Sequence, residues 1–152
     1  MFTVSQSPAS SLFPLVAGGV AVPFYADPDD ADVVPSALDL LASALETVTG
    51  YRPGRLDRLG GVKRLLVVAG TLGRCTLIDR LVAEGRLEGA DAMAGDGERF
   101  LVRVVDRPTP DMERALVVAG SDRRGTAYGL LEISRRVGVS PWSYWADVPA
   151  PE

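Results

Sequence analysis

Two similar stretches decide the fold of this chain: RLLVVAGTLGR at residues 64–74 and RALVVAGSDRR at residues 114–124. In each, an apolar run is followed by glycine and then by a segment in which apolar residues recur at helical spacing. Runs that are apolar on both faces are typical of parallel strands buried between helices. Each stretch therefore predicts a strand, a turn and a helix. A duplicated unit would explain the likeness, but so would two buried strands of one sheet, which we favour.

The first stretch predicts a strand over residues 65–69, a glycine turn at Gly70 and a helix that buries Leu77, Ile78 and Leu81. Strand centres in such a sheet lie in the hydrophobic core. Four valines are expected there: Val67, Val68, Val117 and Val118.

After the second stretch, Ser121 or Asp122 can cap the start of a helix, and Gly138 can end it. The apolar spacing places one set of residues on a single face of this helix. These residues are Ala127, Leu130, Leu131, Ser134 and Val137.

The flanking segments complete the sheet. Residues 100–105 alternate as a half-buried strand does, and Pro108 follows them. Earlier, Gly18 and Gly19 favour a tight reversal between two short strands, and residues 34–48 carry one apolar stripe of a helix. Gly50 is suited to end that helix. The prediction is one α/β domain with a mixed sheet of about four or five strands covered by about three helices.

Composition limits the function. A chain of 152 residues, 47% apolar and 24% charged, is typical of one soluble globular domain. A net charge of −4 offers no basic surface for nucleic acid. The apolar stretch before Arg52, the first basic residue, is interrupted by Pro14 and Pro23. It therefore favours neither a signal peptide nor a membrane helix, and a cytoplasmic location is expected.

Residue types exclude several kinds of catalysis. Without histidine the chain has no Ser-His-Asp triad, no Cys-His pair and no His-based zinc site. Cys75, the one cysteine, is expected to be a buried apolar residue. The acidic residues Asp27, Asp29, Asp30 and Asp32 lack the alternation of a calcium loop and favour a helix start instead. No metal or cofactor is predicted.

Glycine between a strand and a helix is also the pattern of phosphate-binding loops. Neither AGTLGR nor AGSDRRG has the spacing of a dinucleotide-binding or P-loop motif. The second would place Asp122 against a phosphate unless Arg123 or Arg124 compensated. Both arginines oppose the helix dipole and favour a carboxylate partner. That partner could be Asp122, another residue of this domain, a following domain or an acidic sugar.

The last residues form the apolar, proline-rich segment SPWSYWADVP. Trp142, Tyr144 and Trp145 gain free energy only when something covers them, either this domain or a following one. The prolines give the segment the stiff character of a connection between domains.

The segment GSDRRGTAYGLLEISRRVGVSPWSYWADVPAP (residues 120–151) closely resembles the N-terminal domain of glycoside hydrolase family 115, the xylan α-glucuronidases. Residues 15–53 and 67–88 resemble the same domain, so the resemblance covers nearly the whole chain. It implies an auxiliary α/β domain at residues 1–138, like those of other barrel glycoside hydrolases. Residues 139–152 would connect it to a (β/α)₈ barrel that this chain does not include.

The resemblance also implies a parent enzyme that removes glucuronic acid or its 4-O-methyl form from xylan with inversion, using two carboxyl groups of the barrel. No catalytic residue is assigned to this chain, which alone is expected to be inactive. Members of that family can be secreted, which bears on the expected location. A freestanding carbohydrate- or protein-binding module is the alternative, and a nucleotide-binding domain a weaker one. Candidate residues at an interface or near substrate are Asp122, Arg123, Arg124, Tyr128, Trp142, Tyr144, Trp145 and Asp147.

Overall fold

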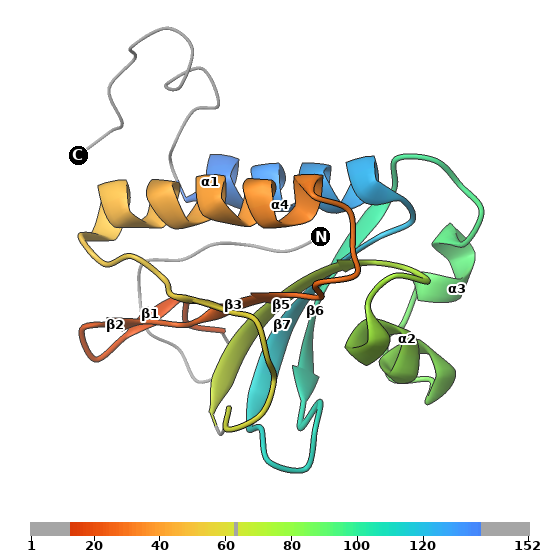
Figure 1. Cartoon of the computed structure of the whole chain (residues 1–152), viewed down its shortest axis with the longest axis horizontal. Coiled ribbons are helices and arrows are strands. Elements are labelled where there is room, and N and C mark those ends of the chain that lie inside the picture. The colour runs from red at the N-terminus through yellow and green to blue at the C-terminus, as the bar shows by residue number, and fades with distance from the viewer. Residues whose placement is uncertain (1–12, 63, 138–152) are drawn as a thin grey trace, which may run out of the picture.

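A computed structural model describes residues 13–62 and 64–137, which form one α/β domain (Figure 1). The strands are β1 (Val16–Ala17), β2 (Val20–Ala21), β3 (Phe24–Ala26), β4 (Arg55–Leu56), β5 (Leu65–Thr71), β6 (Phe100–Asp106) and β7 (Arg114–Gly120). The helices are α1 (Val33–Thr49), α2 (Thr76–Ala83), α3 (Ala90–Met93) and α4 (Arg123–Arg136). The predicted fold class is confirmed.

The main sheet has five strands in the order β4-β3-β5-β7-β6. The first four are parallel, and β6 runs antiparallel to β7 at the edge. In the centre, Val68 of β5 lies beside Val117 of β7. Val67, Val68, Val117 and Val118 are all fully buried, which confirms their predicted place in the core.

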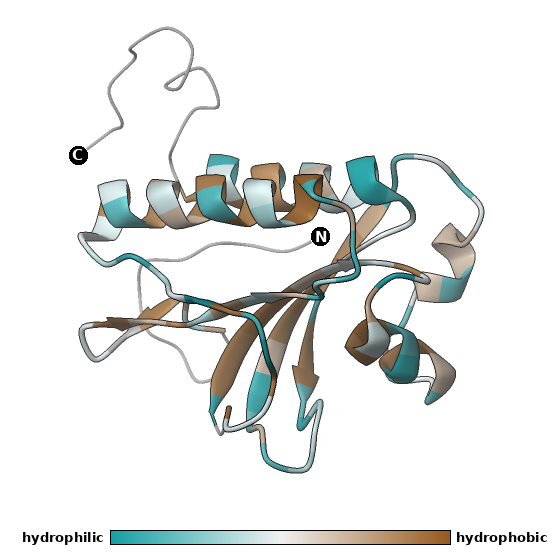
Figure 2. Cartoon of the chain, viewed as in Figure 1, coloured by the Kyte–Doolittle hydropathy of each residue, from teal (hydrophilic) through white to brown (hydrophobic). Residues whose placement is uncertain are grey.

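Helices cover both faces of this sheet (Figure 1). On one face, residues of α1 and α4 pack in one hydrophobic cluster with Val67 and Val118. On the other, residues of α2 and α3 pack with Val68 and Val117. Figure 2 shows the apolar residues concentrated on the central strands. Among the described residues, no helix has the length and apolarity needed to cross a bilayer.

The two similar stretches form the same strand-to-helix unit, but the helices that follow them lie on opposite faces of the sheet. Val68 and Val118 are equivalent when the stretches are aligned, yet Val68 packs on the α2 side and Val118 on the α4 side. This follows from a one-residue shift in register, because Val68 is paired with Val117 instead. Each valine therefore faces the helix that follows its own strand.

Gly70 lies within β5 and not at a turn, so that prediction was wrong. A methyl group at Gly70 would lie 2.5 Å from Cβ of Cys75. The equivalent Gly120 would meet the backbone nitrogen of Thr126 at 2.1 Å. Glycine is needed at both positions because each strand end lies directly against the start of its own helix.

The predicted turns are confirmed at Gly18, Gly19 and Gly50. Gly18 and Gly19 have φ of 59° and 76° and join β1 to β2. Gly50 ends α1 in the left-handed conformation, and its N–H donates to the carbonyl of Glu46. These positive φ values explain why glycine stands at each position.

The residues predicted for the buried face of α4 were correct in part. Ala127, Leu130 and Ser134 are buried as expected, but Leu131 is only half-buried and Ile133 is buried. The reason is that α4 packs on both the sheet and α1, so its buried stripe is wider than one row of residues. Gly138, the predicted end of this helix, lies outside the described residues.

Candidate functional site

Asp122, one of the two residues predicted to cap α4, is its cap. Its Oδ1 accepts a hydrogen bond from the N–H of Gly125 at 2.7 Å, and its Oδ2 accepts one from the N–H of Glu98 at 3.1 Å. These bonds, that from Gly125 first, hold the pKa of Asp122 below its ordinary value. Asp122 therefore joins the start of α4 to the loop before β6.

The loop before β6 is fixed against α4 by backbone contacts. A methyl group at Gly125 would lie 2.1 Å from the carbonyl oxygen of Arg99, so only glycine permits this approach. The N–H of Arg99 donates to Oγ of Ser121 at 3.0 Å. Glu98 has a φ of 60°, which is unusual for a residue other than glycine. The loop and the helix start thus form one rigid unit.

Arg124 finds its carboxylate partner within this domain. Its Nη1 lies 3.0 Å from Oε1 of Glu98, which raises the pKa of Arg124. Both side chains are largely exposed, so the pair contributes little to stability. Arg123 is also exposed, and its guanidinium makes no ion pair or hydrogen bond with any residue of the described ranges. The sequence left open several carboxylate partners for the two arginines. For Arg124 the partner is another residue of this domain, Glu98.

Tyr128 lies one turn after Arg124 on α4 and is 46% exposed. The structure therefore brings four predicted residues together at the start of α4: Asp122, Arg123, Arg124 and Tyr128. The other four candidates, Trp142, Tyr144, Trp145 and Asp147, lie outside the described residues.

Sequence reasoning missed Glu98 and Arg99. They come just before β6, and antiparallel pairing of Phe100 with Gly120 brings them beside the start of α4. The sequence feature that could have indicated them is the pair of glycines in GDGER, residues 95–99. Glycines just before a strand allow the backbone to turn and to come close to another segment.

The start of α2 carries a second carboxylate contact, which corrects the prediction for the acidic cluster. Asp32, the cap residue of α1, makes no side-chain capping bond. Instead, Oδ2 of Asp27 accepts from the N–H of Thr76 at 3.1 Å, and Oδ2 of Asp30 accepts from the N–H of Thr71 at 2.7 Å. Both aspartates are at least nine-tenths buried. Their carboxylates accept hydrogen bonds from backbone N–H groups at the end of β5 and the start of α2. The spacing of the aspartates in the sequence did not indicate these contacts.

These contacts bear on nucleotide binding. In doubly wound sheets, ligands bind where helices leave neighbouring strands toward opposite faces, which here occurs between β3 and β5 and between β5 and β7. Asp27 and Asp30 already bridge the first place, and Asp122 occupies the start of α4 at the second. The chain's own carboxylates thus accept from the helix-start donors that a phosphate would use.

Cys75 is fully buried, as predicted. Burial is the main cause that raises the pKa of its thiol to about 12, so the thiol stays protonated and unreactive. Within residues 13–62 and 64–137, no three His, Cys, Asp or Glu side chains are grouped as a metal site would require.

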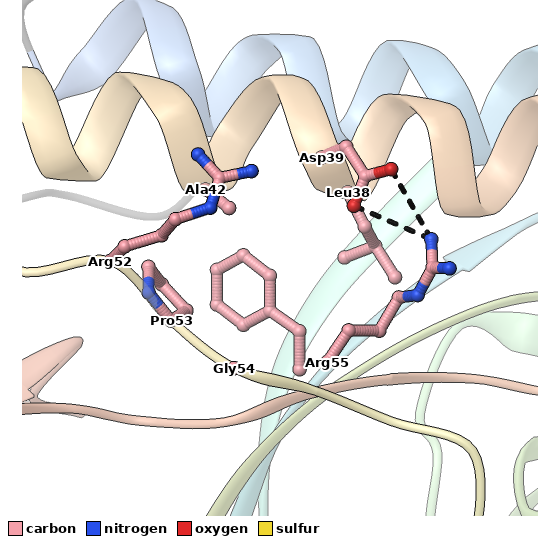
Figure 3. Close-up of a pocket in the computed structure, with 8 residues that line it drawn as sticks. Leu38, Asp39, Ala42, Arg52, Pro53, Gly54 and Arg55 are labelled. Carbon is pink, nitrogen blue, oxygen red and sulfur yellow. Dashed lines mark hydrogen bonds and ion pairs between the residues drawn. The ribbon is translucent and has the colours of Figure 1, made fainter.

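A cavity of about 350 Å³ lies between α1 and the segment before β4 (Figure 3). Arg52 and Arg55 lie on either side of it, and Nη1 of Arg55 is 3.3 Å from both oxygens of Asp39. Arg52 pairs with Glu46 at 3.1 Å. The apolar lining residues, such as Phe24, are almost fully covered. The cavity holds charged groups but no nucleophile with a base beside it.

No family model matches the chain, and no curated protein matches it either. Among solved structures, it is similar to a family GH115 4-O-methyl-α-glucuronidase with specificity for decorated arabinogalactans. The TM-score is 0.65 and the sequence identity 34%. The match covers 88% of this chain but only 16% of that enzyme. The chain is thus similar to one domain-sized part of a much larger glycosidase.

Proposed function

We propose that this chain is a noncatalytic α/β domain of a GH115 α-glucuronidase, at the N-terminal side of the catalytic barrel. The observation that carries the proposal is the 34% identical match over 88% of the chain but 16% of the larger enzyme. Residues 1–138 would form the domain, and residues 139–152 would lead toward a (β/α)₈ barrel.

The chemistry of the described residues supports a noncatalytic role. The chain has no histidine, and its cysteine thiol is buried and protonated. The carboxylates of Asp27, Asp30 and Asp122 accept backbone hydrogen bonds and serve structure. An inverting glycosidase needs an acid and a base on either side of the scissile bond, with room for water. In this proposal the barrel provides both.

The proposed substrates of the parent enzyme carry glucuronic acid or 4-O-methylglucuronic acid side chains. Xylan follows from the sequence resemblance, and decorated arabinogalactan from the specificity of the similar enzyme. Asp122, Arg123, Arg124 and Tyr128 would contact the barrel more readily than the sugar, as would the aromatic residues of the 139–152 segment.

The test is a chimera of the similar GH115 enzyme in which this chain replaces the matching part. We expect the chimera to release 4-O-methylglucuronic acid from decorated arabinogalactan, and the isolated chain to release none from that substrate or from glucuronoxylan. A chimera with an unrelated α/β domain of similar size is the control. If the two chimeras are equally inactive, the proposal fails, and release by the isolated chain would contradict the noncatalytic role.

A freestanding binding module is the second candidate, favoured by the cavity between Arg52 and Arg55 (Figure 3). Guanidinium groups can donate hydrogen bonds to sugar hydroxyls, and the carboxylate of a neighbouring aspartate can accept hydrogen bonds from them. Retention of the isolated chain on insoluble xylan, lost in Arg52→Gln and Arg55→Gln variants, would support this candidate. Such retention together with an inactive chimera would favour it over the first.

A further inference from the structure

The first two turns of α4 expose basic and aromatic side chains whose presence is not explained by the stability of the helix. We call Arg123, Arg124 and Tyr128 the α4 basic face. Arg123 and Arg124 are the first two residues of the helix, where the N-terminal end of the dipole disfavours positive charge. Asp122 already caps this end through the N–H of Gly125. The arginines therefore do not help the helix to begin.

The two arginines differ in their surroundings. Arg124 pairs with Glu98 at 3.0 Å, and Glu98 is held by the bond from its N–H to Asp122. The nearby Arg99 pairs with Asp96 at 2.5 Å. Arg123 has no such counterion among the described residues. It is the cation of this cluster that remains available to a carboxylate from elsewhere.

Tyr128 extends the face along the helix. It lies four residues after Arg124, a spacing that puts two side chains on the same side of a helix, and it is 46% exposed. Tyrosine and arginine are enriched among residues that dominate binding at protein interfaces. The backbone below is rigid because Gly125 packs on Arg99, so docking here would cost little ordering.

We propose that the α4 basic face docks the rest of the same enzyme, and that a carboxylate of that part pairs with Arg123. This inference rests on the proposed function. The match to 16% of a GH115 enzyme means that most of such an enzyme lies outside this domain and is available as its contact partner. The unpaired positive charge of Arg123 selects an acidic contact surface, and Tyr128 adds apolar area one turn further along α4, on the side of Arg124.

The test compares amide hydrogen exchange in the isolated chain and in the active chimera described above. Docking predicts that residues 122–130 exchange at least about tenfold more slowly in the chimera. The β1–β2 hairpin, residues 16–21, is the internal control. An active chimera with unchanged exchange at residues 122–130 would overturn the inference while leaving the proposed function intact. An inactive chimera would overturn both.

Variants provide the second measurement. The double variant Arg123→Gln, Tyr128→Ala should leave the Tm of the isolated chain nearly unchanged, because both side chains are exposed there, but should abolish the slowed exchange in the chimera. Arg135→Gln, an exposed arginine near the other end of α4, is the matched control and should keep it. Slowed exchange that survives the double variant would contradict the inference. So would binding of free glucuronate to the isolated chain that is lost with Arg123→Gln, because the face would then be a sugar-acid site.

Discussion

Asp30, in the loop after β3, reaches the last residue of β5, where its Oδ2 accepts a hydrogen bond from the N–H of Thr71 at 2.7 Å. The two residues are 41 positions apart and both are buried. Because the bond joins the loop after β3 to the carboxyl end of the neighbouring strand β5, it bridges the place from which α1 and α2 run to opposite faces of the sheet. The free energy that this bond contributes to folding therefore measures how firmly the carboxyl ends of β3 and β5 are held together.

The substitution Asp30→Ala should destabilise the domain by about 1–3 kcal/mol, because it leaves the buried N–H of Thr71 without an acceptor. Urea unfolding of the isolated chain measures the change. Asp29→Ala, at an exposed neighbouring position, is the control. Equal urea midpoints for the two variants would show that the Asp30 bond contributes nothing.

Truncation of Val117 or Val118 to alanine should cost roughly 1–3 kcal/mol each, because both are fully buried and on opposite faces of the sheet. The same substitution at Val104, which is 46% exposed on the edge strand β6, should have little effect. The free energy of unfolding in urea distinguishes them. A cost at Val104 as large as that at Val117 would speak against the observed packing.

Gly125→Ala should destabilise the domain by about 1–3 kcal/mol or more, because the new methyl group would lie 2.1 Å from the carbonyl oxygen of Arg99. A carbonyl of the main chain cannot move away as a flexible side chain can. Gly54→Ala is matched to it, since the space around Gly54 is open and its φ is not positive. Thermal unfolding should separate the two variants clearly, and similar Tm values would contradict the close contact.

The cap of α4 should make stability depend on acid pH. The pKa of Asp122 is lower in the folded chain than its ordinary value of 3.8, so its contribution is present above that value and is lost as pH falls through the lower, folded pKa. Asp122→Asn removes this titration and keeps an oxygen at the cap. The difference in unfolding free energy between the wild-type chain and this variant should therefore shrink as pH falls below 3.8. A difference that stays constant or grows would contradict the role of the charged cap.

Local pattern was enough to predict the β1–β2 hairpin, β5, β6, β7, the helices α1, α2 and α4, and two candidates for the cap of α4, since each depends on neighbours in sequence. The short elements β3, β4 and α3 were not predicted. Val67 and Val118 could be placed in the core because buried parallel strands need apolar residues on both faces. Contacts between distant segments could not be predicted in this way. Glu98 meets Asp122 only because β6 pairs with β7, and Asp27 meets Thr76 only because β3 lies beside β5.

Gly70 shows the limit of reading one residue type. Glycine after an apolar run predicts a turn when positive φ is the assumed reason. Here the reason is crowding from Cys75 and Ile78 of the next helix, which no pattern within the strand reveals. The same crowding at Gly120 comes from Thr126, so the repeated Ala-Gly pair marks a close strand-to-helix contact in both units.

The one-residue shift between β5 and β7 also limits how this domain can vary. Exchanging residues 64–74 with residues 114–124 would keep each second valine directed toward its own helix, because both stretches use the same positions for that contact. Inserting a single residue into either strand would instead turn every following side chain toward the wrong layer. Relatives of this chain should therefore tolerate whole-unit replacement and new side chains in these strands far better than any change in strand length.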